Sequence, residues 1–300
     1  MDSLNNFYKY LEINKNLSSY TIRNYSNDLS DFFKFIKEKN VSNIEKISKL
    51  IIREYLSSLI EKKYQKKSIA RKLSIIRSYF RYLKSKNIIT ENHAELIHAP
   101  KSTKTLPQII EKEEIKKLLE TPKFNTTNGA RDSAILEIFY STGIRVSEMH
   151  NIDINNVDFN QQNIRILGKG SKYRLVLYGN KCQESLQNYT SYFRNKLILD
   201  PKNSNALFLN KYGSRLSVRS IQRLVKKYML ISGISNNVHT HSLRHTFATH
   251  LIEGGADIKV VQDLLGHESP TTTQIYTHTS AKHTKEAYFK SHPKAKLDIK

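Results

Sequence analysis

The sequence predicts a mainly α-helical protein of two domains, with one small antiparallel β-hairpin in the second domain. Three observations support this fold class. Apolar residues recur at three- and four-residue steps, two short strand-like segments flank a glycine-containing turn near residue 170, and a proline-bounded polar stretch divides the chain at residues 99–108. With 300 residues, of which 38% are hydrophobic, the chain is long enough for two separate cores.

The first domain, residues 1–98, is predicted to be helical. One helix is expected over residues 18–40, a shorter one over 46–63 and a third over 65–87. The apolar stripe of the first of these helices consists of Ile22, Tyr25, Leu29, Phe32 and Ile36. Such a stripe must be buried against other helices, so a small helical bundle is expected.

The helix over residues 65–87 has a face of one charge sign. Between Glu61 and Glu91 there are ten basic residues and no acidic one. A solvated face usually mixes both signs, whereas a one-signed basic face suits contact with the phosphates of a nucleic acid. The residues expected to make these contacts are Lys67, Arg71, Lys72, Arg77, Arg81 and Lys84.

The second domain, residues 109–300, is predicted to combine several helices with the hairpin. Helices are expected over residues 111–120, 131–143, 181–199, 217–232, 239–255 and 258–267. Ser217 is the expected N-cap of one helix, and Gly143 and Gly254 are expected to end two others. Residues 164–167 and 173–178 form the strands of the hairpin.

The charge balance points to a polyanionic partner. The chain carries 49 basic and 27 acidic residues, a net charge of +22, and the excess is present in both domains. The sequence contains no run of 18 apolar residues and no signal-peptide pattern at its start, and Cys182 is the single cysteine. We therefore expect a cytoplasmic protein whose partner is nucleic acid and not a membrane.

The second domain also collects residue types that suit the handling of a phosphodiester. They are Arg145, Lys169, His241, Arg244, His267 and Tyr276. Fixed cations stabilise the negative charge of a phosphoryl-transfer transition state, and a tyrosine hydroxyl can attack phosphorus when a neighbouring group takes its proton. A covalent phosphotyrosine keeps the energy of the broken bond, so this chemistry is expected to need neither metal nor ATP.

Five motifs carry a resemblance to a known family. In chain order they are STGIRVSE (141–148), GKG (168–170) followed by Lys172, HSLRHTFATH (241–250), LLGH (264–267) and QIYTH (274–278). They resemble the successive signature boxes of the tyrosine recombinase, or phage integrase, family. The N-terminal helices and the linker are similar to the family's SAM-like core-binding domain. The tail AYFKSHPKA is similar to the ending of Xer recombinases, with Lys294 where arginine is usual.

The resemblance implies that the two domains form a C-shaped clamp around double-stranded DNA. Tyr276 would be the nucleophile, forming a 3′-phosphotyrosyl link and releasing a 5′-hydroxyl. Arg145 and Arg244 would hold the scissile phosphate, and Lys169 would protonate the departing oxygen. Lys172, in the same turn, competes with Lys169 for that role.

The resemblance also implies roles for residues around this centre. His241 would manage the proton of the tyrosine, His267 would hydrogen-bond a nonbridging phosphate oxygen, and Glu148 would orient Arg145. A zinc site at His241 and His245 is disfavoured, because Ser242 stands where the H-E-x-x-H motif has its glutamate.

At the level of assembly, the resemblance implies a homo- or hetero-tetramer of recombinases that passes through a Holliday junction on two DNA sites. The segment after Tyr276 would dock into the next protomer, with Tyr288 and Phe289 as an aromatic anchor, and a DNA translocase could activate the enzyme. Resolution of chromosome or plasmid multimers is the favoured role. The alternatives are an integrase of a phage or mobile element, a type IB topoisomerase and a noncatalytic DNA-binding relative. Arg219 and Arg223 are equally compatible with backbone contact and with a solvated face.

Overall fold

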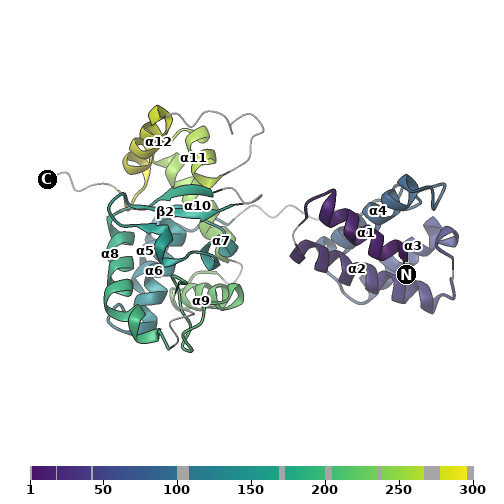
Figure 1. Cartoon of the computed structure of the whole chain (residues 1–300), viewed down its shortest axis with the longest axis horizontal. Helices are drawn as coiled ribbons and strands as arrows, with labels where there is room; N and C mark the ends of the chain where they lie inside the picture. The colour runs from purple at the N-terminus through teal and green to yellow at the C-terminus, as the bar shows by residue number, and fades with distance from the viewer. Residues whose placement is uncertain are drawn as a thin grey trace. The chain divides into compact units, whose positions relative to one another are not determined.

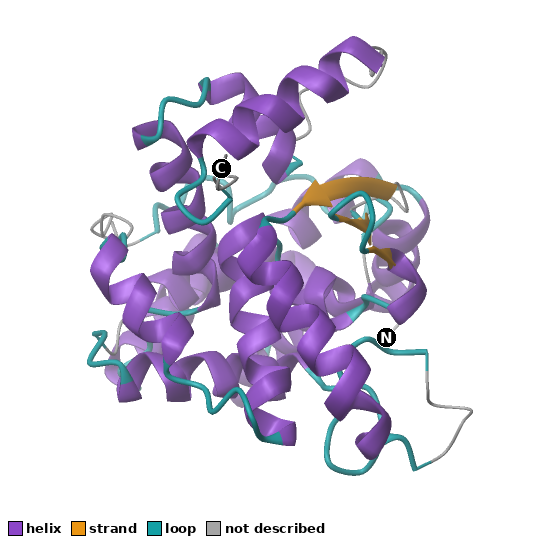
Figure 2. Ribbon diagram, turned by 90° about the vertical axis from the view of Figure 1, so that its left-hand side faces the viewer, coloured by secondary structure: helices purple, strands orange, loops and turns teal. Residues whose placement is uncertain are grey.

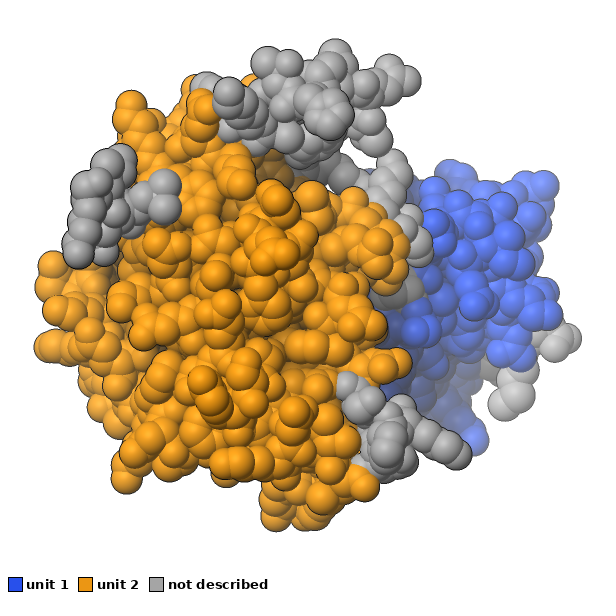
Figure 3. All heavy atoms as spheres, turned by 60° about the vertical axis from the view of Figure 1, so that its left-hand side comes forward, with its two compact units in different colours: residues 1–105 blue, residues 106–300 orange. Residues whose placement is uncertain are grey.

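In the computed structural model, the chain forms two compact units, residues 1–105 and 106–300 (Figure 3). It describes residues 2–17, 19–41, 43–99, 108–168, 173–199, 205–235, 238–266 and 278–295, without the side chains of residues 2 and 278–283. The linker predicted from the sequence, residues 99–108, includes the point at which the two units divide. Each unit has its own hydrophobic core.

Unit 1 is a bundle of helices around an aromatic core. Its elements are α1 (Asp2–Ile13), α2 (Ser19–Glu38), the short η1 (Ile44–Lys46), α3 (Lys49–Glu61) and α4 (Lys66–Ser85). Phe7 and Tyr79 are fully buried, with ring centroids 5.1 Å apart. Leu29 and Phe32, from the predicted apolar stripe, are also fully buried on α2. The helical periodicity therefore identified the buried face of this helix correctly.

The prediction that Lys72 lies on an outer, phosphate-binding face of α4 is wrong. Only 3% of its side chain is exposed, and its Nζ lies 3.0 Å from Oδ1 of Asp28 and 2.6 Å from Oδ2 of Asp31. Burial acts to lower the pKa of Lys72, but hydrogen bonds to both carboxylates outweigh it, so the pKa is raised. Arg71 is also paired with Asp28. Acids on α2, more than forty residues earlier in the chain, thus neutralise charge that seems unbalanced along α4 alone.

The same prediction is wrong for Arg77, which is half-buried and holds the end of the unit together. Its Nε donates to the carbonyl oxygen of Ala94 at 3.1 Å, and its Nη2 donates to that of Ile97. The other four cations named for this face are exposed: Lys67, Arg71, Arg81 and Lys84. Of these, Arg71 is paired with Asp28, and Nη2 of Arg81 lies 3.8 Å from Oε1 of Glu95.

Unit 2 is also mainly helical, as Figure 1 shows. Its helices are α5 (Lys112–Glu120), α6 (Thr127–Thr142), α7 (Val146–His150), α8 (Asn180–Asn188), α9 (Val218–Ile231), α10 (Thr240–Glu253), α11 (Ile258–Leu265) and α12 (His278–Ser291). Its strands are β1 (Val157–Asp158), β2 (Asn163–Leu167) and β3 (Tyr173–Leu177). Short turns of helix complete the unit at η2 (Ile154–Asn156), η4 (Tyr189–Phe193) and η5 (Arg194–Leu197).

Helix α6 is the central element of unit 2. Every residue from Gly129 to Thr142 is buried, and the helix packs against α5, α8 and α10. The Thr126 hydroxyl accepts a hydrogen bond from the Gly129 N–H at 3.1 Å and caps its start. Gly143, at φ +59°, ends it in the left-handed conformation, as the sequence predicted. A Cβ at Gly143 would lie 2.4 Å from Cδ1 of Phe247, so no larger residue fits there.

The three strands form a small antiparallel sheet in the order β1-β2-β3 (Figure 2, orange). In the β2–β3 hairpin, Leu167 pairs with Tyr173 and Arg165 with Leu175. These four side chains are exposed, whereas Ile164 and Ile166 on β2 and Val176 on β3 are buried. Arg174 has the same strand parity as Val176, so its side chain enters the protein.

Tyr288 and Phe289, predicted to be an aromatic anchor in a pocket of the partner, pack instead in the core of their own unit. Tyr288 is fully buried in its own unit, and its hydroxyl donates to the carbonyl oxygen of Ser141 at 3.0 Å. Its ring stacks on that of His292, 5.2 Å away. Helix α12 packs on α10 and α11 of the same chain. The tyrosine therefore anchors the C-terminal helix to the domain that carries it.

The described part of the chain lacks two kinds of feature. None of its helices has both the length and the apolar character needed to cross a membrane. No group of three or more histidine, cysteine, aspartate or glutamate side chains is arranged there to hold a metal ion.

Candidate active site

The end of α6 places Arg145 at the start of α7. Gly143 turns the chain, and Arg145 then takes an extended conformation as the N-cap of the next helix. Its side chain is 42% exposed. An arginine on a tight turn with a half-exposed guanidinium can reach a ligand without moving the helices that carry it.

Glu148 holds Arg145 in place. The backbone N–H of Arg145 donates to Oε2 of Glu148 at 2.7 Å, and its Nη1 donates to Oε1 at 3.0 Å. The carboxylate is only 6% exposed. The interaction predicted between Glu148 and Arg145 is therefore present in the structure.

A third residue, Arg174, binds both oxygens of the same carboxylate. Its Nη1 lies 2.8 Å from Oε1 of Glu148 and its Nη2 lies 2.9 Å from Oε2, a bidentate pair. Burial acts to raise the pKa of Glu148, but the hydrogen bonds from Arg174 and Arg145 and their charges outweigh it, so the pKa is lowered. Glu148 is therefore ionised at neutral pH.

Sequence reasoning missed Arg174. The signal that could have found it is the alternation of β3, in which Tyr173 and Leu175 face outward while Arg174 shares the inward parity of Val176. A charged side chain on the inward face of a strand needs a buried partner, and Glu148 is that partner.

Arg244, on α10, joins the end of α6 to the end of α11. Its Nη1 donates to the carbonyl oxygen of Gly143 at 2.7 Å and its Nη2 to that of Leu265 at 2.8 Å. It is 5% exposed, and burial, followed by the positive charge of Arg145, lowers its pKa to about 10. It stays protonated at neutral pH because that value is well above 7. Since the charge of Arg145 acts on Arg244, the two arginines expected to share a phosphate lie close together.

Among the described residues, this cluster has more positive than negative charge. Arg145 and Arg174 are paired with the carboxylate of Glu148, and Arg244 lies near them, bonded to the carbonyl oxygen of Gly143. The contacts of Arg145 and Arg244 with described residues use only part of the five N–H donors that each guanidinium has. A half-exposed excess of positive charge with spare donors is a binding site for an anion such as a phosphate group.

His241 lies one helical turn before Arg244 on α10 and is exposed. Partial loss of hydration, then the charges of His245, Arg244, His239 and Arg145, lower its pKa. The rings of His241 and His245 meet edge to face with centroids 5.0 Å apart. His241 is therefore neutral at pH 7 and can accept a proton next to the arginines.

Three of the predicted site residues, Lys169, His267 and Tyr276, lie outside the described residues, as does Lys172. Gly266, which precedes His267 in the chain, is described. It ends α11 at φ +65°, and a Cβ there would meet Cδ and Nε of Arg174 at 2.8 Å. The end of α11 therefore lies against the arginine cluster.

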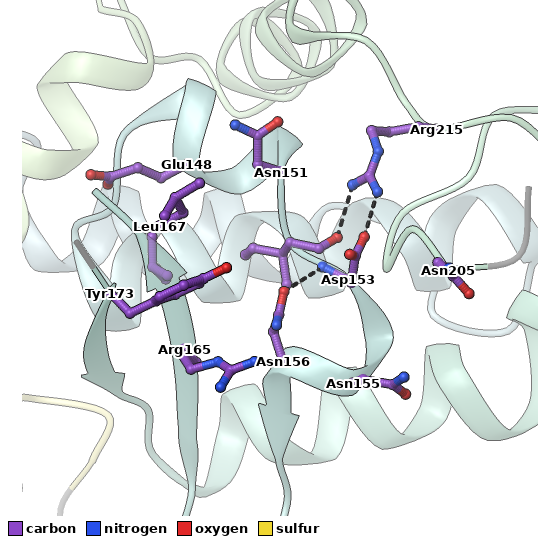
Figure 4. A pocket seen from close by; sticks show the side chains of 12 residues that line it. Glu148, Asn151, Asp153, Asn155, Asn156, Arg165, Leu167, Tyr173, Asn205 and Arg215 are labelled. Carbon is purple, nitrogen blue, oxygen red and sulfur yellow. Dashed lines mark hydrogen bonds and ion pairs between the residues drawn. The ribbon is translucent and has the colours of Figure 1, made fainter. Parts of the chain in front are cut away.

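A polar pocket of about 550 Å³ lies on the other side of Glu148 (Figure 4). Its lining residues are rich in asparagine and include the ion pair between Arg215 and Asp153. Figure 4 shows the carboxylate of Glu148 at one end, turned away from the centre of the pocket, and Arg165 beside the ring of Tyr173, at 4.9 Å from its centroid. The pocket and the arginine cluster are thus separate features with one residue in common.

Family models match both units. The model for the phage integrase family matches residues 108–283, and that for the N-terminal SAM-like domain of phage integrases matches residues 4–87. The chain belongs to the phage integrase family.

Relatives of this recombinase carry Xer names. It is 41% identical to the tyrosine recombinase XerC of Oceanobacillus iheyensis over 294 residues, which is 97% of this chain and 96% of that protein. It is 36% identical to XerC of Bacillus subtilis over 300 residues (98% and 99%) and 38% identical to the tyrosine recombinase XerD of Staphylococcus haemolyticus over 289 residues (96% and 98%). These matches place it among the Xer tyrosine recombinases, which are DNA-cleaving and rejoining enzymes.

Solved structures agree with this assignment. The recombinase resembles the XerH site-specific recombinase bound to its palindromic difH substrate in a post-cleavage complex, with a TM-score of 0.70, 25% identity and coverage of 95% of this chain and 83% of the other. A lambda integrase dimer bound to a core site has the same fold, with a TM-score of 0.69, 18% identity and coverage of 92% and 97%.

Proposed function

We propose that this recombinase cleaves and rejoins double-stranded DNA at a specific site through a covalent bond between Tyr276 and a 3′-phosphate. Arg145 and Arg244 hold the scissile phosphate. Lys169 protonates the departing 5′-oxygen, His241 accepts the proton of the tyrosine and His267 donates a hydrogen bond to a nonbridging oxygen. The observation that carries the proposal is the cluster of three arginines with one carboxylate among the described residues, because an anionic ligand would complete its charge balance.

The proposed chemistry balances without a further reactant. The phenolic oxygen of Tyr276 bonds to phosphorus while the bond from phosphorus to the 5′-oxygen breaks. The phenolic proton passes to His241, whose lowered pKa leaves the imidazole neutral and able to take it. Lys169 supplies a proton to the 5′-oxygen. Attack by a 5′-hydroxyl on the phosphotyrosine reverses these steps and rejoins the strand, so ATP is not consumed.

The two units take different parts in this proposal. Unit 1 is the core-binding domain and residues 109–300 form the catalytic domain, and the two close around the duplex as a C-shaped clamp. The solved XerH relative, bound to its difH substrate, supports DNA as the partner. Exposed basic residues such as Lys67 and Lys84 on α4 and Arg219 and Arg223 on α9 are available for phosphate contacts.

We propose that the enzyme acts in the cytoplasm as a tetramer of recombinases on two DNA sites, passing through a Holliday junction. The C-terminal tail of the chain docks on the next protomer, and a DNA translocase is a candidate activator. Full-length relatives named XerC and XerD favour the resolution of chromosome or plasmid multimers over integration of a mobile element.

The proposal is tested with a nicked DNA duplex whose cleaved end diffuses away, so that the covalent adduct accumulates. Wild-type protein should form a protein–DNA adduct that resists denaturation, and Tyr276→Phe should form none. Tyr212→Phe, which alters a tyrosine that is 68% exposed in the same unit, is the control and should react like the wild type. Persistence of the adduct in Tyr276→Phe would place the nucleophile elsewhere and contradict the proposal.

A further inference from the structure

Arg174 counters the negative charge that Glu148 brings close to Arg145. Glu148 orients Arg145 by binding both its backbone N–H and its Nη1. A carboxylate 3.0 Å from a guanidinium also offsets the positive charge that the guanidinium offers to a phosphate. If Glu148 had Arg145 as its only partner, it would orient the guanidinium of Arg145 but weaken the attraction of that guanidinium for a phosphate.

The geometry of Arg174 removes this conflict. Its planar fork matches both oxygens of Glu148, at 2.8 and 2.9 Å, so it supplies a full counter-charge to the carboxylate. The pair is well shielded from water, because the side chain of Arg174 is 18% exposed and that of Glu148 is 6% exposed. The charge of Arg145, at 42% exposure, is then left for a ligand.

Arg174 also lies against the end of α11. Gly266 leaves no room for a Cβ, which would meet Cδ and Nε of Arg174 at 2.8 Å. The Nε is buried and has no hydrogen-bond partner among the described residues, where packing against Gly266 holds the stem. Arg174 thus connects strand β3, directly after the hairpin turn, with the residue that precedes His267.

We propose that Arg174 is a positioning residue for strand cleavage, which neutralises Glu148 so that Glu148 can orient Arg145 without cancelling its charge toward the scissile phosphate. This inference rests on the proposed function, since it assumes that Arg145 binds that phosphate. Arg174 acts through Glu148 and Arg145 and does not itself touch the DNA.

The test compares single-turnover cleavage of the nicked duplex by Arg174→Met, Glu148→Gln and the double variant. Methionine keeps a stem that packs on Gly266 but carries no charge, so the rate should fall by up to about 10²-fold, the size of effect expected from a misplaced reacting group. Glu148→Gln in that background removes the carboxylate charge while keeping an acceptor for Arg145, so it should raise the rate to about that of Glu148→Gln alone. Damage to packing alone would not be reversed by a second substitution.

Controls separate the outcomes. Arg165→Met removes a charge from the exposed face of the same hairpin and should leave the cleavage rate of bound complexes unchanged. Should Arg174→Met not fold, as judged by its thermal melting, Arg174→Gln takes its place in the same comparison. A double variant as slow as the single one, or an Arg174 variant as fast as the wild type, overturns the inference. Absence of any adduct with wild-type protein would instead sink the proposed function.

Discussion

Each unit contains a cluster of ion pairs around a buried carboxylate, Asp28 in unit 1 and Glu148 in unit 2, and the two clusters differ in charge balance. In unit 1, Arg71 and Lys72 meet Asp28 and Asp31, two cations with two anions. In unit 2, Arg145 and Arg174 pair with Glu148 and Arg244 lies near them, so that among the described residues three arginines accompany one carboxylate. The first cluster is balanced and ties α4 to α2. The second retains positive charge and can bind a ligand.

Burial by itself does not distinguish these clusters. Lys72 has a side chain that is 3% exposed, and Arg244 is 5% exposed. The pKa values move in opposite directions, because the acids around Lys72 raise its pKa whereas burial and Arg145 lower that of Arg244 to about 10. A buried cation therefore marks a functional site when its neighbours are also cations, and a structural one when acids surround it.

The largest effect is expected from Arg145→Ala. Loss of a fixed donor to transition-state charge typically slows a reaction about 10²–10³-fold. Binding should change by only a few-fold, because many backbone contacts share it. Single-turnover cleavage and a mobility-shift titration, each at the same salt concentration, measure the two quantities. Lost binding with an unchanged cleavage rate in the bound complex would contradict the catalytic role assigned to Arg145.

Lys72→Met should break the balanced cluster and lower the stability of unit 1. It leaves Asp28 buried without its ammonium partner, which costs roughly 3 kcal/mol of unfolding free energy. Denaturant unfolding measures this loss, and Lys67→Met, on the exposed side of the same helix, should stay within about 0.5 kcal/mol of the wild type. Cleavage by the folded, DNA-bound variant should not change. Equal stability of the two variants would show that the pair is not structural.

Glu148→Gln alone should have a smaller effect on cleavage. The variant keeps an acceptor for Arg145 but weakens charge-assisted hydrogen bonds worth about 1.5 kcal/mol, so a loss of roughly tenfold is expected. The single-turnover assay measures it. A loss as large as that of Arg145→Ala would mean that the carboxylate acts on the substrate directly.

The smallest effect concerns pH. His241 must be neutral to accept a proton, so cleavage should fall as the pH drops through its pKa, which lies below the ordinary histidine value of about 6.5. His245→Ala removes one of the charges that lower this pKa, so the pKa rises and the acidic limb of the rate profile should move to higher pH. His98→Ala, exposed in unit 1, is the control. An acidic limb that stays at the same pH, or moves to lower pH, would mean that His241 does not accept the proton of Tyr276.

The sequence predicted what local chemistry determines. Most of the helices, the hairpin, the cap at Ser217 and the stop at Gly143 follow from periodicity and from the preferences of particular residues, and the structure contains them. The helix predicted over residues 181–199 is shorter, because α8 ends at Asn188 and π-helical and 3₁₀ turns follow it. The short strand β1 and helix α12 were not predicted, because a two-residue strand has no measurable period and α12 has a weak apolar stripe.

The sequence predicted less accurately the residues whose role depends on a partner far away in the chain. Lys72 seemed to be surface charge because its acids lie on another helix, and Tyr288 seemed to be available because the sequence does not show that Ser141 faces it. Arg174 was overlooked for the same reason, since only the fold brings it to Glu148. Arg145, Arg244 and His241 were found because their motifs recur in chain order, and the structure brings these three together.

The central claim is that the unbalanced arginine cluster compensates the charge of one DNA phosphate, and a neutral substrate tests it most directly. A nicked duplex with a methylphosphonate at the scissile position lacks the negative charge of the nonbridging oxygen. We predict that Arg145→Ala, much slower than the wild type on the ordinary phosphodiester, loses most of that deficit on the methylphosphonate. An equal deficit on both substrates would contradict the claim that Arg145 acts by its charge on the phosphate.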